Sequence, residues 1–543
     1  MTEVANLTEL RNLPITTESV YVKKYEEYIS GGEGFFIWKT EDIFQTGTYS
    51  TENFGTIIKS NLVPSKEGSW VRQYDGFINV SFFGANGVGN DFTLNIQRAI
   101  DFASLNANTD NAPVKGSTVF IPNGSYVLTN IILKDGVTVL GESLNKTNIY
   151  SPGATSTQYL FEIESGPVFI NISNLNLIGN DTDKGCFLFR SQNSTSSPFH
   201  GGLWNSRISN INITGFKGNG IYLYGGGDGS EYFLPNQFNI LENVRVFKNS
   251  DFTYALYMTG QNGQISFINC EFDGFFRNGS YSKGQNIRIH NEKQYTSAVV
   301  SFINCTCQDA DYGLFIEWAE NITIDNCWFE NLGVAITVKS NDVDGNDILS
   351  KSINILNSRF ANAAGFGSLN APNNIKVGQC ISVNKSSVNI YNNYVAVSEP
   401  NGIYLNNNSA FLNASNNLTG GINIANNTFQ VAKLGKTFGV MQVINVVTNT
   451  IDCFGSKVIF VNGSTSQITT IKSSINAGEL LNIRANGSSI TFKNSNNIFF
   501  LSSNVNQTIT LNNGENATFI KVDNVVGINY ETYQLVSILK ILP

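Results

Sequence analysis

The sequence predicts an all-β fold, a right-handed single-stranded parallel β-helix between a small N-terminal domain and a β-rich C-terminal domain. The first observation is composition: only 14 % of the 543 residues are charged, against about 25 % in an average soluble domain. Long amphipathic helices need charged residues on their solvent faces, whereas the abundant Gly and Asn suit turns. The second observation is a short sequence motif that recurs every 22 to 36 residues. A repeat of that length without helical segments indicates a solenoid.

The recurring motif consists of an apolar residue, any residue, Asn, and then a short alternating run. It occurs nine times, with its Asn at Asn174, Asn210, Asn243, Asn269, Asn304, Asn326, Asn357, Asn392 and Asn426. We expect each copy to be one coil, with the Asn side chains stacked at a bend and hydrogen bonded along the axis. A second strand of strict period two, such as Ile287–His290, points its apolar residues inward and the alternate residues outward.

The segment before the solenoid has the pattern of a closing cap. Asp91 or Thr93 is expected to begin a helix there. The relevant stretches are Val80–Asp91, Thr93–Ile100, Gly116–Tyr126 and Leu133–Glu142. They resemble the opening of the β-helices of the pectate-lyase superfamily, in which a strand, a Gly-rich turn and a capping helix close the N-terminal end. Asn86 and Asn90 stand where many members of that superfamily carry Asp.

Both ends of the chain resemble parts of phage tailspikes. Gly31–Trp38 and Trp70–Tyr74 resemble the small domain that precedes the β-helix, and the dense alternation over 440–535 resembles the domain that trimerises such spikes. The predicted domains are therefore 1–78, 79–430 and 431–543. The resemblance implies a homotrimeric tailspike depolymerase in the virion tail that acts on the bacterial surface and hydrolyses glycosidic bonds of capsular or surface polysaccharide. It also implies attachment to the baseplate or an adaptor through an N-terminal region that this sequence need not contain.

Charge and cysteine usage exclude several other classes. The net charge is -8, whereas nucleic-acid binding requires a basic surface. No run of about 18 apolar residues or signal peptide is visible, so membrane insertion is not expected. The seven Cys are an odd number in a large chain and are predicted to be small buried residues rather than disulfides or ligands. Asp342-Val-Asp344-Gly345 resembles the start of a calcium loop but lacks the downstream Glu, so neither a metal nor a cofactor is predicted.

A solenoid aligns outward residues of successive coils into columns, and these columns define the candidate site. Glu317 and Asp311 are predicted as the acid/base pair, and His290 stands beside Glu317 in one column. The next position of that column is Lys339 or Thr337. The residues predicted to bind substrate are Arg288, Glu292, Phe315, Tyr257, Tyr222, Lys339 and Trp328. Aromatic rings suit the apolar faces of sugars, and Arg suits hydroxyl or acidic groups.

A second column offers an alternative catalytic pair, Asp273 and Glu330. The two lie two coils apart, roughly 9.6 Å by the strand spacing, which is near the ~6.5–9.5 Å separation of an inverting glycosidase pair. Trp328 would then be the stacking platform.

Two rival functions remain open on the same fold. A polysaccharide lyase would need a uronic acid substrate, a cation that neutralises its carboxylate, and a base such as His290, Lys339 or Tyr295. A receptor-binding adhesin would bind the glycan without shortening it.

Overall fold

The structure is a computed structural model that forms two compact units, Met1–Phe272 and Asp273–Pro543. The residues that it describes are 2–40, 52–64, 67–107, 117–152, 159–163, 168–182, 185–190, 202–226, 235–278, 280–291, 297–343, 346–348, 350–361, 379–384, 386–397, 410–415, 422–425, 428–431, 440–445, 450–452, 458–462, 467–472, 480–486, 489–493, 495, 498–499, 507–522 and 532–539.

The first unit begins with a small sheet around its own apolar core. Its strands follow the order β1 (Thr2–Val4), β2 (Ser19–Val22), β3 (Gly34–Thr40), β5 (Gly68–Gln73) and β4 (Ile57–Ile58). The helix α1 (Leu7–Arg11) starts at Asn6, whose side chain accepts a hydrogen bond from the Glu9 N–H. Together they bury Val4, Leu7, Leu10, Val20, Val22, Phe36, Ile58 and Trp70.

A buried arginine joins this sheet to the turn that follows it. Arg72 donates hydrogen bonds to the carbonyls of Gly55 (3.0 Å), Glu33 (2.9 Å) and Gly32 (2.9 Å). Its guanidinium also lies 4.4 Å from the ring centroids of Phe36 and Phe82. Burial lowers the pKa of Arg72 to about 9. The three carbonyl groups and the two aromatic faces stabilise the positive charge of the guanidinium. Phe82 belongs to the 3-10 turn η3 (Val80–Phe83), so Arg72 fixes the sheet against the next segment.

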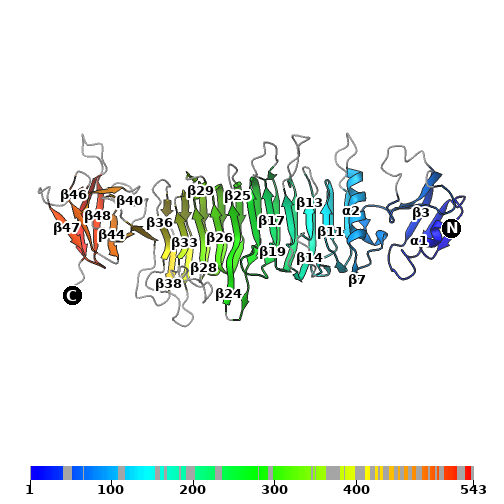
Figure 1. The fold of residues 1–543 in the computed structure, drawn as a ribbon, viewed down its shortest axis with the longest axis horizontal. Coiled ribbons are helices and arrows are strands. Elements are labelled where there is room, and N and C mark those ends of the chain that lie inside the picture. The colour runs from blue at the N-terminus through cyan, green and yellow to red at the C-terminus, as the bar shows by residue number, and fades with distance from the viewer. Residues whose placement is uncertain are drawn as a thin grey trace. The chain divides into compact units, whose positions relative to one another are not determined.

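The predicted capping helix is α2 (Thr93–Ala107). The Asp91 carboxylate accepts the Thr93 N–H at 2.9 Å, which fixes the first turn of the helix. Its buried residues include Ile96, Ala99, Ile100 and Ala103. Figure 1 shows α2 beside the first strands of the β-helix.

The rest of the first unit is a parallel β-helix in which successive coils stack strand on strand. One stack contains β6 (Ile78–Asn79), β8 (Ser117–Ile121), β11 (Val137–Gly141), β14 (Asn171–Thr182), β16 (Arg207–Phe216), β19 (Ile240–Phe247) and β21 (Asn262–Ile268). A second contains β7 (Val88–Asp91), β9 (Gly124–Val127) and β12 (Thr147–Tyr150), and leads into the second half of β14. A third contains β10 (Ile131–Leu133), β13 (Phe161–Ile163), β15 (Phe187–Arg190), β17 (Ile221–Gly225) and β20 (Leu256–Gly260). The short β18 (Asn236–Gln237) pairs with β21.

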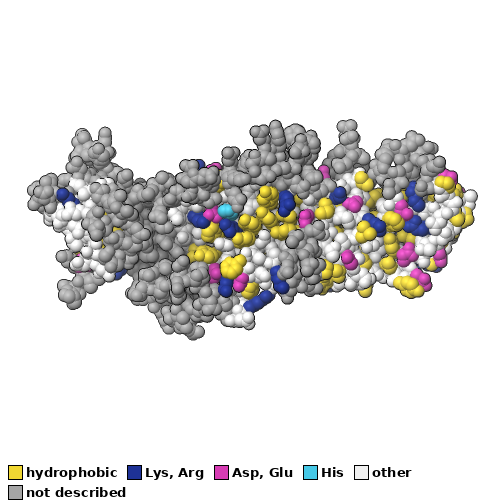
Figure 2. Space-filling view, in the orientation of Figure 1, with side chains coloured by type: hydrophobic (Ala, Val, Ile, Leu, Met, Phe, Trp, Pro, Cys, Tyr) yellow, Lys and Arg dark blue, Asp and Glu magenta, His cyan; other side chains and the backbone are white. Residues whose placement is uncertain are grey.

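The second unit continues with the same coil architecture, and its visible face carries charged and hydrophobic side chains next to one another (Figure 2). One stack contains β24 (Ser280–His290), β26 (Thr306–Glu317), β28 (Trp328–Lys339), β33 (Gln379–Asn384) and β36 (Ala410–Ser415). Another contains β25 (Ser297–Ile303), β27 (Ala319–Asp325), β31 (Ile353–Leu356), β34 (Val388–Tyr391) and β37 (Ile422–Ala425). The first half of β28 is followed by β32 (Arg359–Ala361), β35 (Tyr394–Val397) and β38 (Thr428–Val431). The strands β29 (Asn341–Val343) and β30 (Asn346–Ile348) form a separate hairpin.

The predicted Asn bends are confirmed, and the backbone explains why they are Asn. Eight of the nine Asn have φ between 50° and 62°, the left-handed region that Asn tolerates better than most residues. Asn210 Nδ2 donates to Asn174 Oδ1 at 3.2 Å, and Asn243 Nδ2 donates to Asn210 Oδ1 at 3.2 Å. Asn357 departs from the pattern, because its Nδ2 donates to the carboxylate of Asp325. Asn426 lies outside the described residues.

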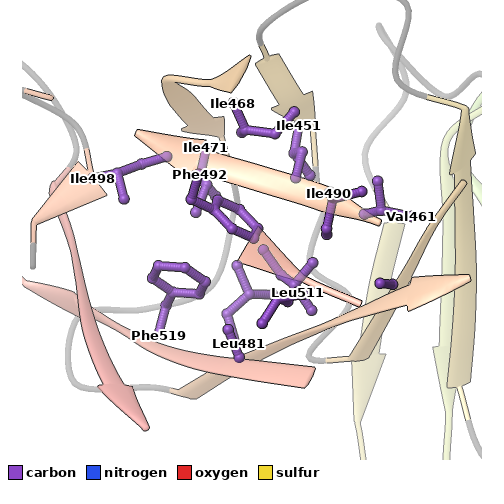
Figure 3. Close-up of a cluster of buried hydrophobic side chains, with 13 residues drawn as sticks. Ile451, Val461, Ile468, Ile471, Leu481, Ile490, Phe492, Ile498, Leu511 and Phe519 are labelled. Carbon is purple, nitrogen blue, oxygen red and sulfur yellow. The ribbon is translucent and has the colours of Figure 1, made fainter. Parts of the chain in front are cut away.

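The C-terminal region changes from parallel to antiparallel pairing. The strands β39 (Val440–Asn445), β41 (Val458–Asn462) and β44 (Leu480–Asn486) are still parallel, but β48 (Asn516–Val522) and β49 (Thr532–Leu539) pair antiparallel. The remaining short strands are β40 (Thr450–Asp452), β42 (Gln467–Ile468), β43 (Thr470–Lys472), β45 (Ile490–Lys493), β46 (Ile498–Phe499) and β47 (Thr508–Leu511). Figure 3 shows their apolar core, in which the rings of Phe492 and Phe519 lie 5.2 Å apart.

The cysteine prediction is confirmed for six of the seven residues, which are buried and form no disulfide: Cys186, Cys270, Cys305, Cys307, Cys327 and Cys380. Cys453 lies outside the described residues. Within the described part of the chain, no helix has the length and apolar character needed to cross a membrane.

Candidate active site

The first group of candidate residues, here termed the histidine cluster, consists of Arg288, His290, Phe315, Glu317 and Lys339. Strand pairing brings it together: His290 pairs with Glu317 and Glu317 with Lys339, while Arg288 pairs with Phe315. The register therefore selects Lys339, and not Thr337, as the neighbour of Glu317.

Glu317 is the centre of the histidine cluster. One of its oxygens, Oε2, lies 2.6 Å from His290 Nδ1 and 3.4 Å from an Arg288 Nη2, and the other, Oε1, lies 2.5 Å from Lys339 Nζ. Burial alone would raise the pKa of Glu317, but the hydrogen bonds and charges of His290 and Lys339 lower the pKa to about 2. Glu317 is therefore ionised at any neutral pH and does not supply a proton to a substrate.

In the histidine cluster, a histidine that can act as a base lies beside the positive charges of Arg288 and Lys339. A carboxylate at Nδ1 keeps the proton on that nitrogen, which makes Nε2 the basic atom of the His290 ring. The ring of Phe315 lies under the cations, 5.2 Å from Lys339 Nζ and 5.9 Å from Arg288 Cζ. Figure 2 shows the histidine of this face with basic, acidic and hydrophobic side chains around it. Such an arrangement suits an anionic group and the removal of a proton near it.

The position of Asp311 argues against its predicted pairing with Glu317. Both lie on β26 and are six residues apart, which corresponds to about 20 Å along an extended strand. A carboxyl pair that acts on one glycosidic bond is separated by less than about 10 Å. Asp311 is also only 3 % exposed, and it accepts a hydrogen bond from the Gly284 N–H at 3.2 Å. It has a structural role in holding the start of β24.

A second group lies at the other end of the same strands and is termed here the tryptophan cluster: Asp309, Trp328, Glu330, Asn331 and Arg359. Trp328 is 37 % exposed, and the Arg359 guanidinium lies 4.4 Å from its ring centroid. The indole N–H of Trp328 donates to Glu330 Oε2 at 3.0 Å, which fixes this carboxylate next to the ring. An exposed indole beside a fixed carboxylate is an arrangement suited to a sugar ring.

Asp309 is the second carboxyl group of the tryptophan cluster. Its φ of 63° turns its side chain out of the regular strand alternation, and its Oδ1 accepts a hydrogen bond from Asn331 Nδ2 at 3.0 Å. Burial raises the pKa of Asp309, the Asn331 hydrogen bond opposes this, and the charge of Glu330 raises the pKa further. A carboxyl group whose pKa is raised, with a second carboxylate beside it, is an arrangement that general acid and base catalysis uses.

The predicted alternative pair, Asp273 and Glu330, stays a prediction, and the burial of Asp273 argues against it. Asp273, on β22 (Glu271–Asp273), is only 1 % exposed and accepts a hydrogen bond from Gln308 Nε2 at 2.9 Å. Gln308 is itself the strand partner of Glu330, so Asp273 and Glu330 stand two coils apart, as the sequence predicts. Asp309 takes the place expected for Asp273. The only sequence signal for it is the tolerance of Asp for left-handed backbone.

The remaining predicted residues are distributed as follows. Tyr222 and Tyr257 lie in the first unit, where their rings stack with centroids 4.8 Å apart. Glu292 and Tyr295 lie outside the described residues. The calcium-like run also falls partly outside them, and the described part of the chain contains no group of His, Cys, Asp and Glu arranged to hold a metal.

Two regions of the chain match known protein families. Residues 3–75 match the small four-stranded β-sheet domain of phage tail proteins, and residues 77–223 match the rhamnogalacturonase A/epimerase, pectate lyase-like family. The body of the chain is a parallel β-helix, and its first part, residues 77–223, is the part that matches the pectate lyase-like family. Both matches agree with the resemblances in the sequence, and the second begins where η3 and α2 close the first coil. No curated protein matches the chain.

Similar solved structures include phage tailspikes, and two A-modules of mannuronan C-5 epimerases from Azotobacter vinelandii are also among them. The gp42 tailspike of Acinetobacter phage vb_AbaP_AS12 is 12 % identical, with a TM-score of 0.53 over 100 % of this chain and 94 % of that one. The gp49 tailspike of Acinetobacter baumannii bacteriophage Fri1, a capsular polysaccharide depolymerase, is 12 % identical, with a TM-score of 0.47 over 99 % and 92 %. Tailspike protein 2 of Escherichia coli O157:H7 bacteriophage CAB120 is 18 % identical, with a TM-score of 0.47 over 72 % of this chain. The present chain spans about half (51 %) of that protein.

Proposed function

We propose that this protein is a phage tailspike that depolymerises a capsular or other surface polysaccharide of a bacterium. The support is the order of two segments in one chain: a phage tail domain at 3–75 and a sugar-enzyme-type β-helix that starts at 77. The first would belong to the virion tail and the second would act on the bacterial surface. In this proposal the chain is a homotrimer, with residues 431–543 as the trimerisation domain after the β-helix of 79–430.

The proposed reaction is hydrolysis at the tryptophan cluster. The observation that carries it is the pair of neighbouring carboxyl groups, Asp309 with a raised pKa and Glu330 fixed by Trp328. Asp309 donates its proton to the glycosidic oxygen as the bond to the anomeric carbon breaks. Water adds its hydroxyl to that carbon and gives its proton to the Glu330 carboxylate. Trp328 holds the sugar by stacking on its apolar face.

The test is the release of reducing ends from host polysaccharide by the full chain and its variants. Asp309→Asn and Glu330→Gln are each expected to lower the rate by about 10²–10⁴-fold, the usual contribution of a general acid or base. The matched control is Glu320→Gln, which removes an acid from β27 that is paired with Lys351 at 3.5 Å. Wild-type rates in both cluster variants would refute the assignment.

One observation favours a second candidate, a lyase at the histidine cluster. His290 is oriented by an ionised carboxylate and is flanked by Arg288 and Lys339. With a uronic acid in place, the cations would bind its carboxylate while His290 takes the proton on the adjacent carbon. The electron pair would then form a carbon–carbon double bond and expel the neighbouring glycosidic oxygen, so that the product absorbs in the ultraviolet. A rising absorbance during digestion that His290→Asn abolishes would favour this candidate, and an unshortened polysaccharide would favour an adhesin.

A further inference from the structure

The strand β24 begins in a hairpin that projects from the coil. Its first residues pair antiparallel with β23 (Phe276–Arg277), so that Phe276 lies opposite Tyr281. The later part of β24, by contrast, pairs in parallel with β26. Figure 1 shows β24 extending past the ends of the strands beside it. Residues 274–278 and 280–284 are termed here the hairpin arm: its outer part projects from the solenoid, and Ser282 at its base pairs with Ala310 of the coil.

The base of the hairpin arm is fixed to the backbone around Asp309. The Gly274 N–H donates to the Gln308 carbonyl at 2.8 Å, and the Ser282 hydroxyl donates to the Asp309 carbonyl at 3.0 Å. Gly274 is required there, because a Cβ at this position would collide with the Asp309 carbonyl oxygen. The Asp311 carboxylate holds the other side of the arm through the Gly284 N–H. The position of the arm relative to Asp309 is thus set by hydrogen bonds at its base.

The tip of the hairpin arm carries aromatic side chains that remain outside the core. Phe276 is 60 % exposed. Its ring lies 4.8 Å from that of Tyr281 at an angle of 50°. Next to it, the Arg277 guanidinium lies 4.7 Å from the ring centroid of Phe275. The arm thus combines apolar ring surface with an arginine, the same combination that Trp328 and Arg359 form in the tryptophan cluster.

We propose that the hairpin arm is a glycan-binding subsite, in which Phe276 stacks on a sugar ring next to the bond that Asp309 acts on. The inference rests on the proposed function and adds a binding residue to it. The ligand is a pyranose unit of the same polysaccharide, because the base of the arm is bonded to the residue that would protonate the glycosidic oxygen. A polysaccharide at that oxygen extends to both sides of the cleaved bond, with Trp328 on one side and the arm on the other. Arg277 would bind hydroxyl or acidic groups at the edge of the ring.

The experiment compares Phe276→Ala, Phe276→Tyr and Phe252→Ala in the full chain. Phe252 is a matched control because its ring is 70 % exposed in the first unit. With host polysaccharide as substrate, we expect Phe276→Ala to raise KM about tenfold with kcat within about twofold, because a contact made equally in ground and transition states affects binding alone. Phe276→Tyr is expected to keep most of the affinity. Phe252→Ala is expected to behave as wild type.

A binding measurement separates failure of the arm from failure of the proposed hydrolysis. Calorimetry of Asp309→Asn with the intact polysaccharide is compared with that of the double variant that also carries Phe276→Ala. A tenfold weaker affinity in the double variant supports the arm even if no variant, nor the wild type, cleaves the glycan. Equal affinities, or a Phe276→Ala variant that loses kcat but not affinity, would overturn the proposal. So would a change of sedimentation in Phe276→Ala, which would assign the ring to a contact between copies of the chain.

Discussion

Replacement of Glu317 by Gln tests the electrostatics of the histidine cluster. In the folded chain the pKa of Glu317 is lowered from the ordinary 4.5 to about 2. A tenfold change in acidity corresponds to about 1.4 kcal/mol, so ionised Glu317 stabilises the fold by about 3 kcal/mol at neutral pH. Because the pKa is lowered by folding, this stabilisation is complete above pH 4.5 and disappears as the pH falls towards 2. At pH 3 about 1.4 kcal/mol of it remains.

The measurement is the free energy of unfolding of wild type and Glu317→Gln in denaturant at pH 7 and pH 3. We expect the difference between the two proteins to shrink by about 2 kcal/mol at the lower pH. Because the wild-type and variant proteins are compared at two pH values, any effect of the amide group in Glu317→Gln that is independent of pH cancels. Glu320→Gln, which breaks an exposed pair with Lys351, should cost under about 1 kcal/mol at pH 7. A difference for Glu317→Gln that is the same at both pH values would refute the ion-pair account of its pKa.

Two further predictions concern single residues. Asn331→Gly removes the hydrogen bond that lowers the pKa of Asp309 while keeping a backbone that tolerates the left-handed φ of 52°. The loss of activity at high pH should therefore move to higher pH in a kcat profile, and an unchanged profile would contradict the role of Asp309 as the acid. Asn210→Ala removes the side-chain hydrogen bonds to Asn174 and Asn243 and leaves a residue with a Cβ at a left-handed φ of 54°. We expect it to lower the free energy of unfolding by about 1–3 kcal/mol. Asn210→Gly should cost less, and equal losses would argue against backbone conformation as the cause.

The fold was predictable because its signals are local. Each coil needs one left-handed bend, and Asn is the residue that both tolerates that backbone and can bond to its neighbour along the axis, as Asn210 and Asn243 do. The parallel register then followed from the period-two strands. The choice between Thr337 and Lys339 was left open by the sequence, because coils of 22 to 36 residues differ in loop length. Only the observed pairing of Glu317 with Lys339 resolves it.

The carboxyl groups proposed to be catalytic were less predictable, because single backbone angles decide where they lie. Asp311 stands near Glu317 in sequence, but an extended strand separates them at about 3.3 Å per residue. Asp309 leaves the regular alternation through one positive φ, which no period reveals. The sequence gives only a weak indication of the hairpin arm. The spacing from Asn269 to Asn304 is 35 residues, longer than the 22 residues from Asn304 to the next Asn of the ladder, so that coil has room for an insertion. Length alone does not say where an insertion projects or what it carries.

The most direct test of hydrolysis at the tryptophan cluster is mass spectrometry of the products formed from purified host polysaccharide. The account predicts fragments whose masses equal whole repeat units plus one water, and almost none from Asp309→Asn. Fragments that lack this water and absorb in the ultraviolet, formed equally by Asp309→Asn, would contradict it and assign the chemistry to His290.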